Sequence, residues 1–351
     1  MYLFGYFVKT ILWGDIMKLS RIQLYVYSVI ITVGGVSLFA ANMAIKNFPT
    51  CGYLVFLLIL PFVLIFVTFI PREANCIKTI LDHNYLRIIL LIYLLLSGLF
   101  SLSAYIGIVS DYYYQETSHF ILLILIILTC LFMSTYGLAN IVRIGFVMLL
   151  VVLVLYTLTL TSNTTHDFTL LKHTPLKLNN LYNLLCFPFL FLDELLLFLF
   201  IPTKKTNKFS LILMIVGTIV FSTGLIFECY LFFTPKYFEN SKYPYLIKYF
   251  AYRNNHYLEH LDILYLICTT AFIIFHFSTQ CEIARIIFKG KRNSIITLIL
   301  PTVLAIGVIF NYKLNMTKEV ASLILMITTI ILTLFFILFK FARRKKHATN
   351  N

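Results

Sequence analysis

The sequence predicts an all-α integral membrane protein with about ten transmembrane helices. Apolar residues make up 60% of the chain and charged residues only 12%, whereas soluble domains average about 45–50% and about 25%. Apolar runs long enough to cross a hydrocarbon layer of about 30 Å as helices recur along almost the whole sequence. The alternating pattern of a membrane β-barrel is absent, and isolated strands cannot satisfy their backbone groups in lipid.

The predicted spans follow these apolar runs in chain order. The runs Ile121–Met133, Val147–Leu160 and Ser322–Phe339 contain no charged residue and are, with slight extension, long enough to cross the hydrocarbon layer as helices. Each predicted helix ends where the polar residues of the next connector begin. We expect helices at about 22–42, 52–70, 86–109, 119–135, 141–161, 180–201, 209–233, 258–280, 293–311 and 318–341.

The ten spans are expected to form one transmembrane domain, residues 18–342, made of two five-helix halves, 22–161 and 180–341. Residues 1–17 are interpreted as an N-terminal extension or as the product of a misplaced start, because Met17 directly precedes a polar lead-in. The basic segment 343–351 is expected to be a cytoplasmic tail.

The connectors on the side that holds both termini carry 19 of the 28 Lys and Arg residues, and the other connectors carry 9. This bias predicts an integral, multi-pass membrane location with both termini in the cytoplasm. The net charge of +14 does not indicate nucleic-acid binding, because the basic residues form no single face or tract.

The polar residues do not indicate an enzyme, a cofactor or a metal site. The seven Cys are scattered mostly inside apolar runs without ligand spacing, which is typical of small buried side chains. A membrane-embedded transferase is a weaker functional hypothesis than a binding or transport protein. Its best candidate for a catalytic pair, His166 and Asp167, consists of two residues that are merely adjacent in a loop.

The first candidate ligand-binding element is the middle of the first span, which contains Thr32, Gly34, Gly35 and Ser37. Paired glycines weaken a helix and let a ligand approach its backbone, and the flanking hydroxyls can bind a polar group. Close packing of two helices through small residues is an equally good interpretation.

The sixth span supplies the second candidate element, with Pro188, Asp193 and Glu194. Proline frees a backbone carbonyl, and a carboxylate in the hydrocarbon costs at least about 2.5–3.5 kcal/mol, so it needs a polar partner. Adjacent residues of a helix point about 100° apart, so the two acids converge poorly on one substrate. We expect one acid to face a polar cavity.

A third candidate is a polar stripe on the eighth span, formed by Asp262, Tyr265 and Thr269 and continued by His276 at helical spacing. We interpret Asp262, Tyr265 and Thr269 as a polar or ion path. His276 taken alone is more typical of a satisfied interior histidine than of a proton relay.

The first and sixth spans begin the two halves, and both carry a helix-weakening element near their middles. This arrangement is typical of inverted-repeat secondary transporters, whose substrate lies at the membrane midplane between broken helices. Half-helix ends can bind a carboxylate and an ammonium group, so an amino acid is the ligand class that this geometry would suit best.

The segments Tyr243–Ile247 and Leu258–Tyr265 resemble the region before and into the eighth helix of endospore germination permeases. These are the GerAB-like B subunits of spore germinant receptors, in the amino acid–polyamine–organocation superfamily. The opening Lys18–Leu24 and the sixth-span residues Phe187–Pro188 and Glu194 are similar too. The chain departs from the family at His260, where Arg is usual, and at Leu192–Asp193, where small residues usually precede the Glu.

The resemblance implies a leucine-transporter-like fold, a 5+5 inverted repeat with broken first and sixth helices. It also implies a small nutrient ligand, an A-type membrane subunit and a C-type lipoprotein as partners, and the spore inner membrane as the location. The expected function is therefore a germinant-receptor subunit that binds a nutrient, with an amino acid expected, at the bilayer midplane. The alternative is a proton- or sodium-coupled amino acid transporter in the cell membrane. The fold would be the same for both, so the sequence hardly separates them.

Overall fold

The structure is a computed structural model, and it describes residues 21–35, 41–48, 51–57, 60–61, 64, 84–161, 208–233, 235–240, 243, 245–246, 261–287, 307 and 327. All regular elements in these ranges are helices, and no strand occurs among them. This confirms the all-α class for the described part of the chain. The helices are α2 (Arg21–Gly35), α3 (Ala41–Asn47), α4 (Gly52–Leu57), α7 (Asn84–Tyr112), α8 (His119–Thr135), α9 (Leu138–Thr161), α11 (Lys208–Phe232), α12 (Pro235–Asn240) and α14 (Leu261–Ile287).

Five of the predicted spans coincide with long helices. The predicted boundaries differ from those of α7, α8, α9 and α11 by three residues or fewer. The predicted end of α14 at residue 280 is wrong, because the helix continues to Ile287. The predicted spans 180–201, 293–311 and 318–341 lie outside the described residues except for positions 307 and 327. The count of ten helices and the two-repeat architecture therefore stay predictions.

Two described helices are long and apolar enough to cross a membrane, Arg87–Tyr112 within α7 and Asp262–Arg285 within α14. The pair α8 and α9 makes a third candidate if it is taken as one broken span, His119–Thr135 with Leu138–Val151, bent by 120°. The bend lies at Gly137, whose φ of 79° is readily adopted only by glycine. The described helices thus support a membrane protein with two or three spans in this part of the chain.

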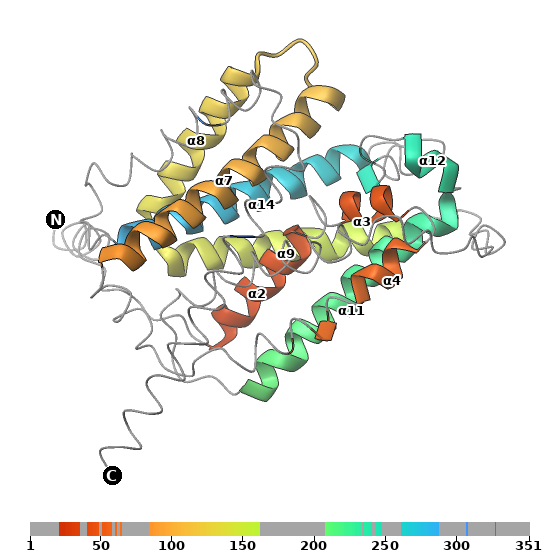
Figure 1. The fold of residues 1–351 in the computed structure, drawn as a ribbon, viewed down its shortest axis with the longest axis horizontal. Coiled ribbons are helices and arrows are strands. Elements are labelled where there is room, and N and C mark those ends of the chain that lie inside the picture. Colours follow the sequence, from red (N-terminus) through yellow and green to blue (C-terminus); the bar gives the residue numbers. More distant parts are fainter. Residues whose placement is uncertain are drawn as a thin grey trace, which may run out of the picture.

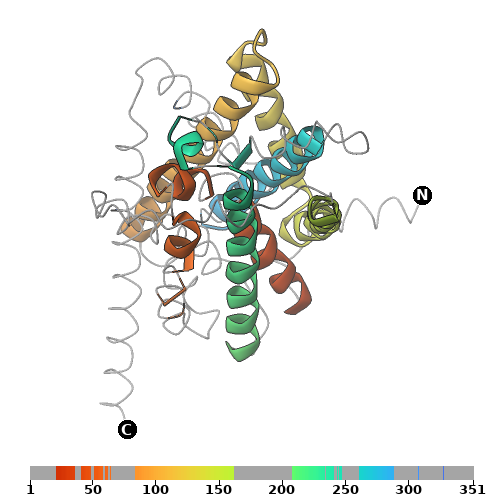
Figure 2. The same cartoon turned by 90° about the vertical axis from the view of Figure 1, so that its right-hand side faces the viewer.

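Helix α14 lies at the centre of the described helices and packs against α2, α7, α8 and α9. In Figure 1 it runs between α7 and α8 on one side and α9 and α2 on the other. Figure 2 shows the same arrangement with α9 seen almost end-on. Helix α11 packs against α2 and α4 rather than forming one of the principal contacts of α14. Polar side chains on α14 therefore have protein neighbours on several sides.

The outer faces of α8 and α9 are apolar. Helix α8 buries one face, which includes Leu123, Ile127 and Cys130. Its opposite face exposes large apolar side chains, and so does α9. A continuous exposed apolar surface of this kind suits hydrocarbon better than water. The exposed residues are Phe120, Ile121, Ile124, Leu125, Leu128 and Phe132 on α8, and Ile144, Phe146, Val147, Leu150, Leu153 and Val154 on α9.

The turn between α3 and α4 is fixed by a tyrosine from α11. The buried Tyr230 hydroxyl donates to the Phe48 carbonyl oxygen at 2.7 Å and accepts from the Gly52 amide at 2.9 Å. A Cβ atom added at Gly52 would lie 2.7 Å from the Ala44 carbonyl oxygen and would also clash with the Tyr230 hydroxyl. Only glycine lets the two short helices and α11 approach this closely.

Replacing Gly52 with alanine is expected to destabilise the protein by about 1–3 kcal/mol, because the new methyl group must displace backbone atoms and not only the end of a flexible side chain. The measurement is thermal denaturation of the purified variant in detergent. Gly217→Ala is the matched control, since a Cβ atom there meets nothing within 4 Å. This control is expected to gain about 0.5–1 kcal/mol from better helix propensity. Equal melting temperatures for the two variants would contradict the packing described at Gly52.

Candidate functional site

The structure describes part of the predicted ligand site on the first span. The backbone is helical through Thr32, Gly34 and Gly35, and Gly35 is the last residue of α2. The other predicted binding residues lie outside the described residues, and they are Ser37, Pro188, Asp193 and Glu194. The structure therefore does not test a midplane pocket between the first and sixth spans.

The predicted polar path on α14 begins at its first turn. The Tyr113 hydroxyl, just after α7, donates to the Asp262 backbone carbonyl oxygen at 2.8 Å. Burial raises the pKa of Tyr113 well above its ordinary value, and the negative charge of Asp262 adds to this effect. The hydroxyl therefore stays protonated and remains a donor. This contact joins the end of α7 to the start of α14.

Tyr265 and Thr269 are both buried on α14. The Tyr265 ring packs edge-on against Tyr245, with ring centroids 6.1 Å apart. The Thr269 hydroxyl lies 3.0 Å from the backbone oxygens of Tyr265 and Leu266 and donates within its own helix. Its remaining hydrogen-bonding capacity is that of an acceptor. Only its lone pairs could serve a passing solute or ion.

A second contact between α7 and α14 lies two turns deeper. The Tyr105 and Thr270 hydroxyl oxygens are 2.5 Å apart. The Thr270 hydroxyl donates its hydrogen to the Leu266 carbonyl oxygen at 2.7 Å. Tyr105 is therefore the donor and Thr270 the acceptor in the bond between the helices. Tyr105 is buried, so water cannot satisfy its hydroxyl group, and the bond to Thr270 does so instead.

The third and deepest contact links Ser97 on α7 with Gln280 and His276 on α14. The Gln280 side-chain nitrogen donates to the Ser97 hydroxyl oxygen at 3.0 Å and lies 2.9 Å from the His276 Nε2 atom. All three residues have no exposed surface. Buried polar side chains inside a membrane are costly unless they are bonded to one another in this way.

The three contacts form one continuous pattern, which we call the α7–α14 seam. On one side of the seam, Ser97 and Tyr105 of α7 and Tyr113 just after it are eight positions apart. Its α14 residues are spaced eight to ten positions apart in the opposite direction. At 1.5 Å per residue, the α7 positions span about 24 Å, which is most of the hydrocarbon thickness. The seam is thus a row of hydrogen-bonding groups along two antiparallel helices.

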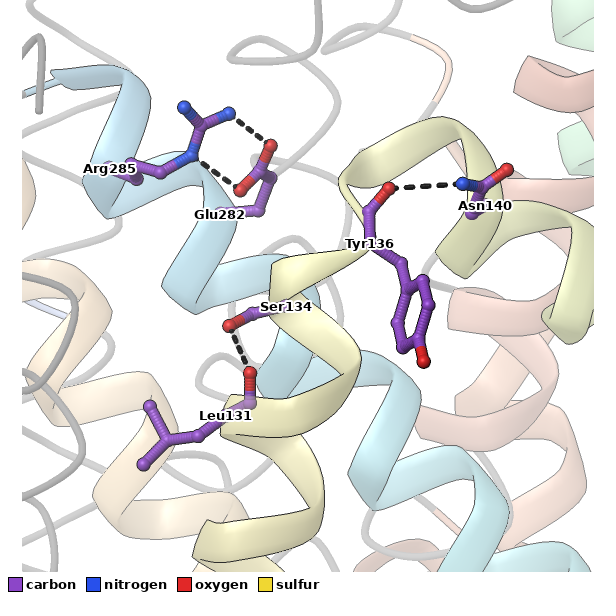
Figure 3. A network of polar contacts seen from close by, with 6 residues as sticks. All are labelled: Leu131, Ser134, Tyr136, Asn140, Glu282 and Arg285. Carbon is purple, nitrogen blue, oxygen red and sulfur yellow. Dashed lines mark hydrogen bonds and ion pairs between the residues drawn. The ribbon is translucent and has the colours of Figure 1, made fainter. Parts of the chain in front are cut away.

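Further polar groups connect α14 to α8. The Ser278 hydroxyl donates to the Cys130 carbonyl oxygen at 3.2 Å, and the Cys130 thiol donates to the Ile274 carbonyl oxygen at 3.8 Å. Near the end of α14, Arg285 forms a two-point ion pair with the buried Glu282 (Figure 3). This pairing neutralises a carboxylate that would otherwise be very costly at that position.

The chemistry of the seam is that of hydrogen bonding and not of covalent catalysis. It offers hydroxyls, one amide and one imidazole, which can bind a polar solute, water or a proton. Within the described ranges, no group of three or more His, Cys, Asp or Glu could hold a metal ion.

The sequence interpretation did not include Ser97 or Gln280. The four-residue spacing of His276 and Gln280, and of Ser97, Ser101 and Tyr105, is the signal that could have indicated them.

Comparisons of the chain with protein families, with curated proteins and with solved structures find no match.

The Tyr105–Thr270 bond is expected to contribute a coupling energy of about 0.5–1.5 kcal/mol in a double-mutant cycle of Tyr105→Phe and Thr270→Val. Each single variant loses the bond, so the double variant is expected to lose less stability than the two singles together. Stability is measured by denaturant unfolding of the purified protein in mixed micelles. Thr129→Val replaces Thr270→Val in a control cycle, because the exposed Thr129 hydroxyl bonds only within α8. Additive losses in both cycles would argue against the bond.

Proposed function

We propose that this protein is the membrane subunit of a spore germinant receptor, which binds a small nutrient inside the bilayer and triggers germination. The observation that carries the proposal is the α7–α14 seam. It places hydrogen-bonding groups along the centre of a bundle whose buried residues are mostly apolar. Membrane proteins concentrate polar residues in this way along solute and ion pathways.

The concentration of polar residues on one helix supports this interpretation over packing alone. Some of the buried polar side chains of α14 bond to other helices, Gln280 to Ser97 of α7 and Ser278 to the Cys130 carbonyl oxygen of α8. A helix whose only role was to pack would be served by apolar and small residues. The buried polar residues of α14 are Thr269, His276, Ser278, Thr279, Gln280 and Glu282.

The sequence resemblance adds the biological part of the proposal. The segment Leu258–Tyr265, which resembles the germination permeases, leads directly into α14. The nutrient, an amino acid in the first instance, would bind at the midplane between the first and sixth spans. An A-type membrane subunit and a C-type lipoprotein would be the partners, in the spore inner membrane with both termini in the cytoplasm. No cofactor, metal or catalytic step belongs to this function.

The second candidate is a secondary transporter that moves an amino acid together with a proton or Na⁺. The observation that favours it is the length of the seam, about 24 Å, because a single binding site needs only a few converging groups. A row of hydroxyls, one amide and one imidazole across most of the membrane suits movement of an ion or proton as well as binding.

The germinant-receptor proposal predicts that Gly35→Leu and Glu194→Gln abolish nutrient-triggered germination while leaving the amount of protein in the spore membrane unchanged. Leucine at position 35 blocks close approach to the α2 backbone, and glutamine at position 194 removes a charge from the sixth span. Germination is followed as the loss of optical density of spores after nutrient addition. Gly217→Leu is the control, because position 217 is exposed with nothing near it. Normal germination in both test variants would remove the assigned binding residues.

Purified protein in liposomes separates the two candidate functions. Uptake of a labelled amino acid that depends on a proton or Na⁺ gradient would establish the transporter. Binding of the amino acid detected by thermal shift, without uptake, would favour the receptor subunit. Loss of nutrient-triggered germination when the A- or C-type subunit is deleted from the spores would then establish it. Neither binding nor uptake across a panel of amino acids and sugars would contradict both.

A further inference from the structure

The deepest contact of the seam contains a histidine whose partner is an amide. An amide carries both a donor and an acceptor, so it can bond to a neutral or to a protonated imidazole. His276, Gln280 and Ser97, here called the His276 cluster, have no exposed surface and join α14 to α7. Histidine is the side chain whose ordinary pKa lies closest to physiological pH. Gain of a proton by this buried imidazole would change the hydrogen bonds that it can make with the amide.

The hydrogen bonds of the cluster define the neutral state. The Gln280 side-chain nitrogen carries two hydrogens, and it has two neighbours, the Ser97 Oγ atom at 3.0 Å and the His276 Nε2 atom at 2.9 Å. With this amide orientation the His276 Nε2 atom must be the acceptor, because an NH₂ group has no lone pair to offer. The imidazole is therefore neutral, with its proton on Nδ1.

The Gln280 side-chain oxygen is the feature that the neutral state leaves unused. It is buried, and the structure gives Gln280 Oε1 no hydrogen-bond partner among the residues it describes. An unsatisfied buried acceptor is costly, so the amide gains a bond for this oxygen if it rotates when a new donor forms beside it. Rotation of the amide by about 180° would place this oxygen against the His276 Nε2 atom and the Ser97 hydroxyl.

We propose that the His276 cluster is an intramembrane proton-binding site whose Gln280 amide presents its NH₂ group to the neutral imidazole and its carbonyl oxygen to the imidazolium. In the binding step a proton from water adds to the Nε2 lone pair of His276. The amide then rotates, Oε1 accepts from the new Nε2–H, and the Ser97 hydroxyl turns to donate to the same oxygen. Release reverses each of these movements, and no other bond forms or breaks.

Charge-assisted bonding favours the second state once the proton is present. A hydrogen bond from an imidazolium to a carbonyl oxygen is roughly twice as strong as one between neutral groups. The Phe272 ring stacks on the imidazole, with centroids 5.7 Å apart and planes 29° apart. An aromatic face attracts a cation more strongly than a neutral ring, so this contact also favours the imidazolium.

The other titratable groups around the cluster come from every helix packed on α14. On α7, Tyr93 and Tyr105 share the face of Ser97 at helical spacing. Cys130 of α8 bonds to Ile274, Tyr27 of α2 packs against Phe275, and the exposed Arg143 of α9 donates to Asn140. On α14, Glu282 and Arg285 pair with each other. The phenols and the thiol are neutral near pH 7, so the amide of Gln280 is the group placed to respond to a proton on His276.

The test follows the protonation of His276 by NMR of protein labelled with ¹⁵N-histidine in lipid nanodiscs. Imidazole nitrogens of neutral and protonated histidine have distinct shifts, and His276→Gln identifies the signal among the eight histidines. The wild-type signal is expected to titrate as a single proton. Gln280→Leu removes the acceptor and is expected to lower the midpoint by about one pH unit, and Gln280→Glu supplies a carboxylate and is expected to raise it by a similar amount.

The signal of His119, at the start of α8 and identified by His119→Gln, is the control, and its ¹⁵N shifts at each pH are expected to be the same in the wild-type protein and in the Gln280 variants. If His276→Gln does not fold, His276→Asn serves the assignment. If Gln280→Leu does not fold, Gln280→Glu tests the response alone. A His276 signal that stays neutral from pH 8 to pH 4 would overturn the proposal. A midpoint that neither Gln280 variant moves would do the same. This proposal requires no particular nutrient, so it can fail while the germinant-receptor function stands.

Discussion

The structure depends on one constraint, which is that polar groups inside a hydrocarbon layer must find their partners within the protein. Helix α14 carries buried polar side chains along most of its length, and groups on the neighbouring helices form hydrogen bonds with several of them. Tyr105 donates to Thr270, Ser97 accepts from Gln280, and the Cys130 carbonyl accepts from Ser278. These bonds fix α14 in position and rotation against α7 and α8, which apolar packing alone would define less sharply. The candidate site is therefore also part of what holds the bundle together.

Aromatic residues close the bundle at the end where α7 finishes and α14 begins. Tyr112 packs edge-on against Tyr243, and Tyr245 packs against Tyr265. The Tyr245 amide donates to the Asn42 side-chain oxygen, which ties this segment to α3. Aromatic side chains with a polar tip suit the boundary between hydrocarbon and water. This end of the bundle thus links α3, α7 and α14.

The sequence predicted the long helices well where their ends are set locally. Helix α8 has the predicted bounds, because Ser118 caps its start and Gly137 follows its end with a positive φ. The end of α14 was predicted seven residues too early, since Glu282 and Arg285 are charged and were assigned to the connector that follows. The burial of Glu282 depends on its pairing with Arg285 within the helix, and Gln280, the last residue of the predicted span, bonds to Ser97, 183 positions away. Composition and periodicity do not contain that tertiary information, which is also why His276 alone suggested an ordinary interior histidine.

Thiol cross-linking between α7 and α14 tests the central claim most directly, which is that the seam residues face each other within the membrane. Tyr105→Cys and Thr270→Cys are combined in a chain whose seven native cysteines are replaced by alanine. A short bifunctional thiol reagent is then applied to intact membranes. The seam predicts efficient cross-linking of this pair and little cross-linking of position 105 with a cysteine at Phe275, which lies about 140° around α14 from Thr270 and packs against Tyr27 of α2. Equal yields from the two pairs, or preference for position 275, would contradict the account.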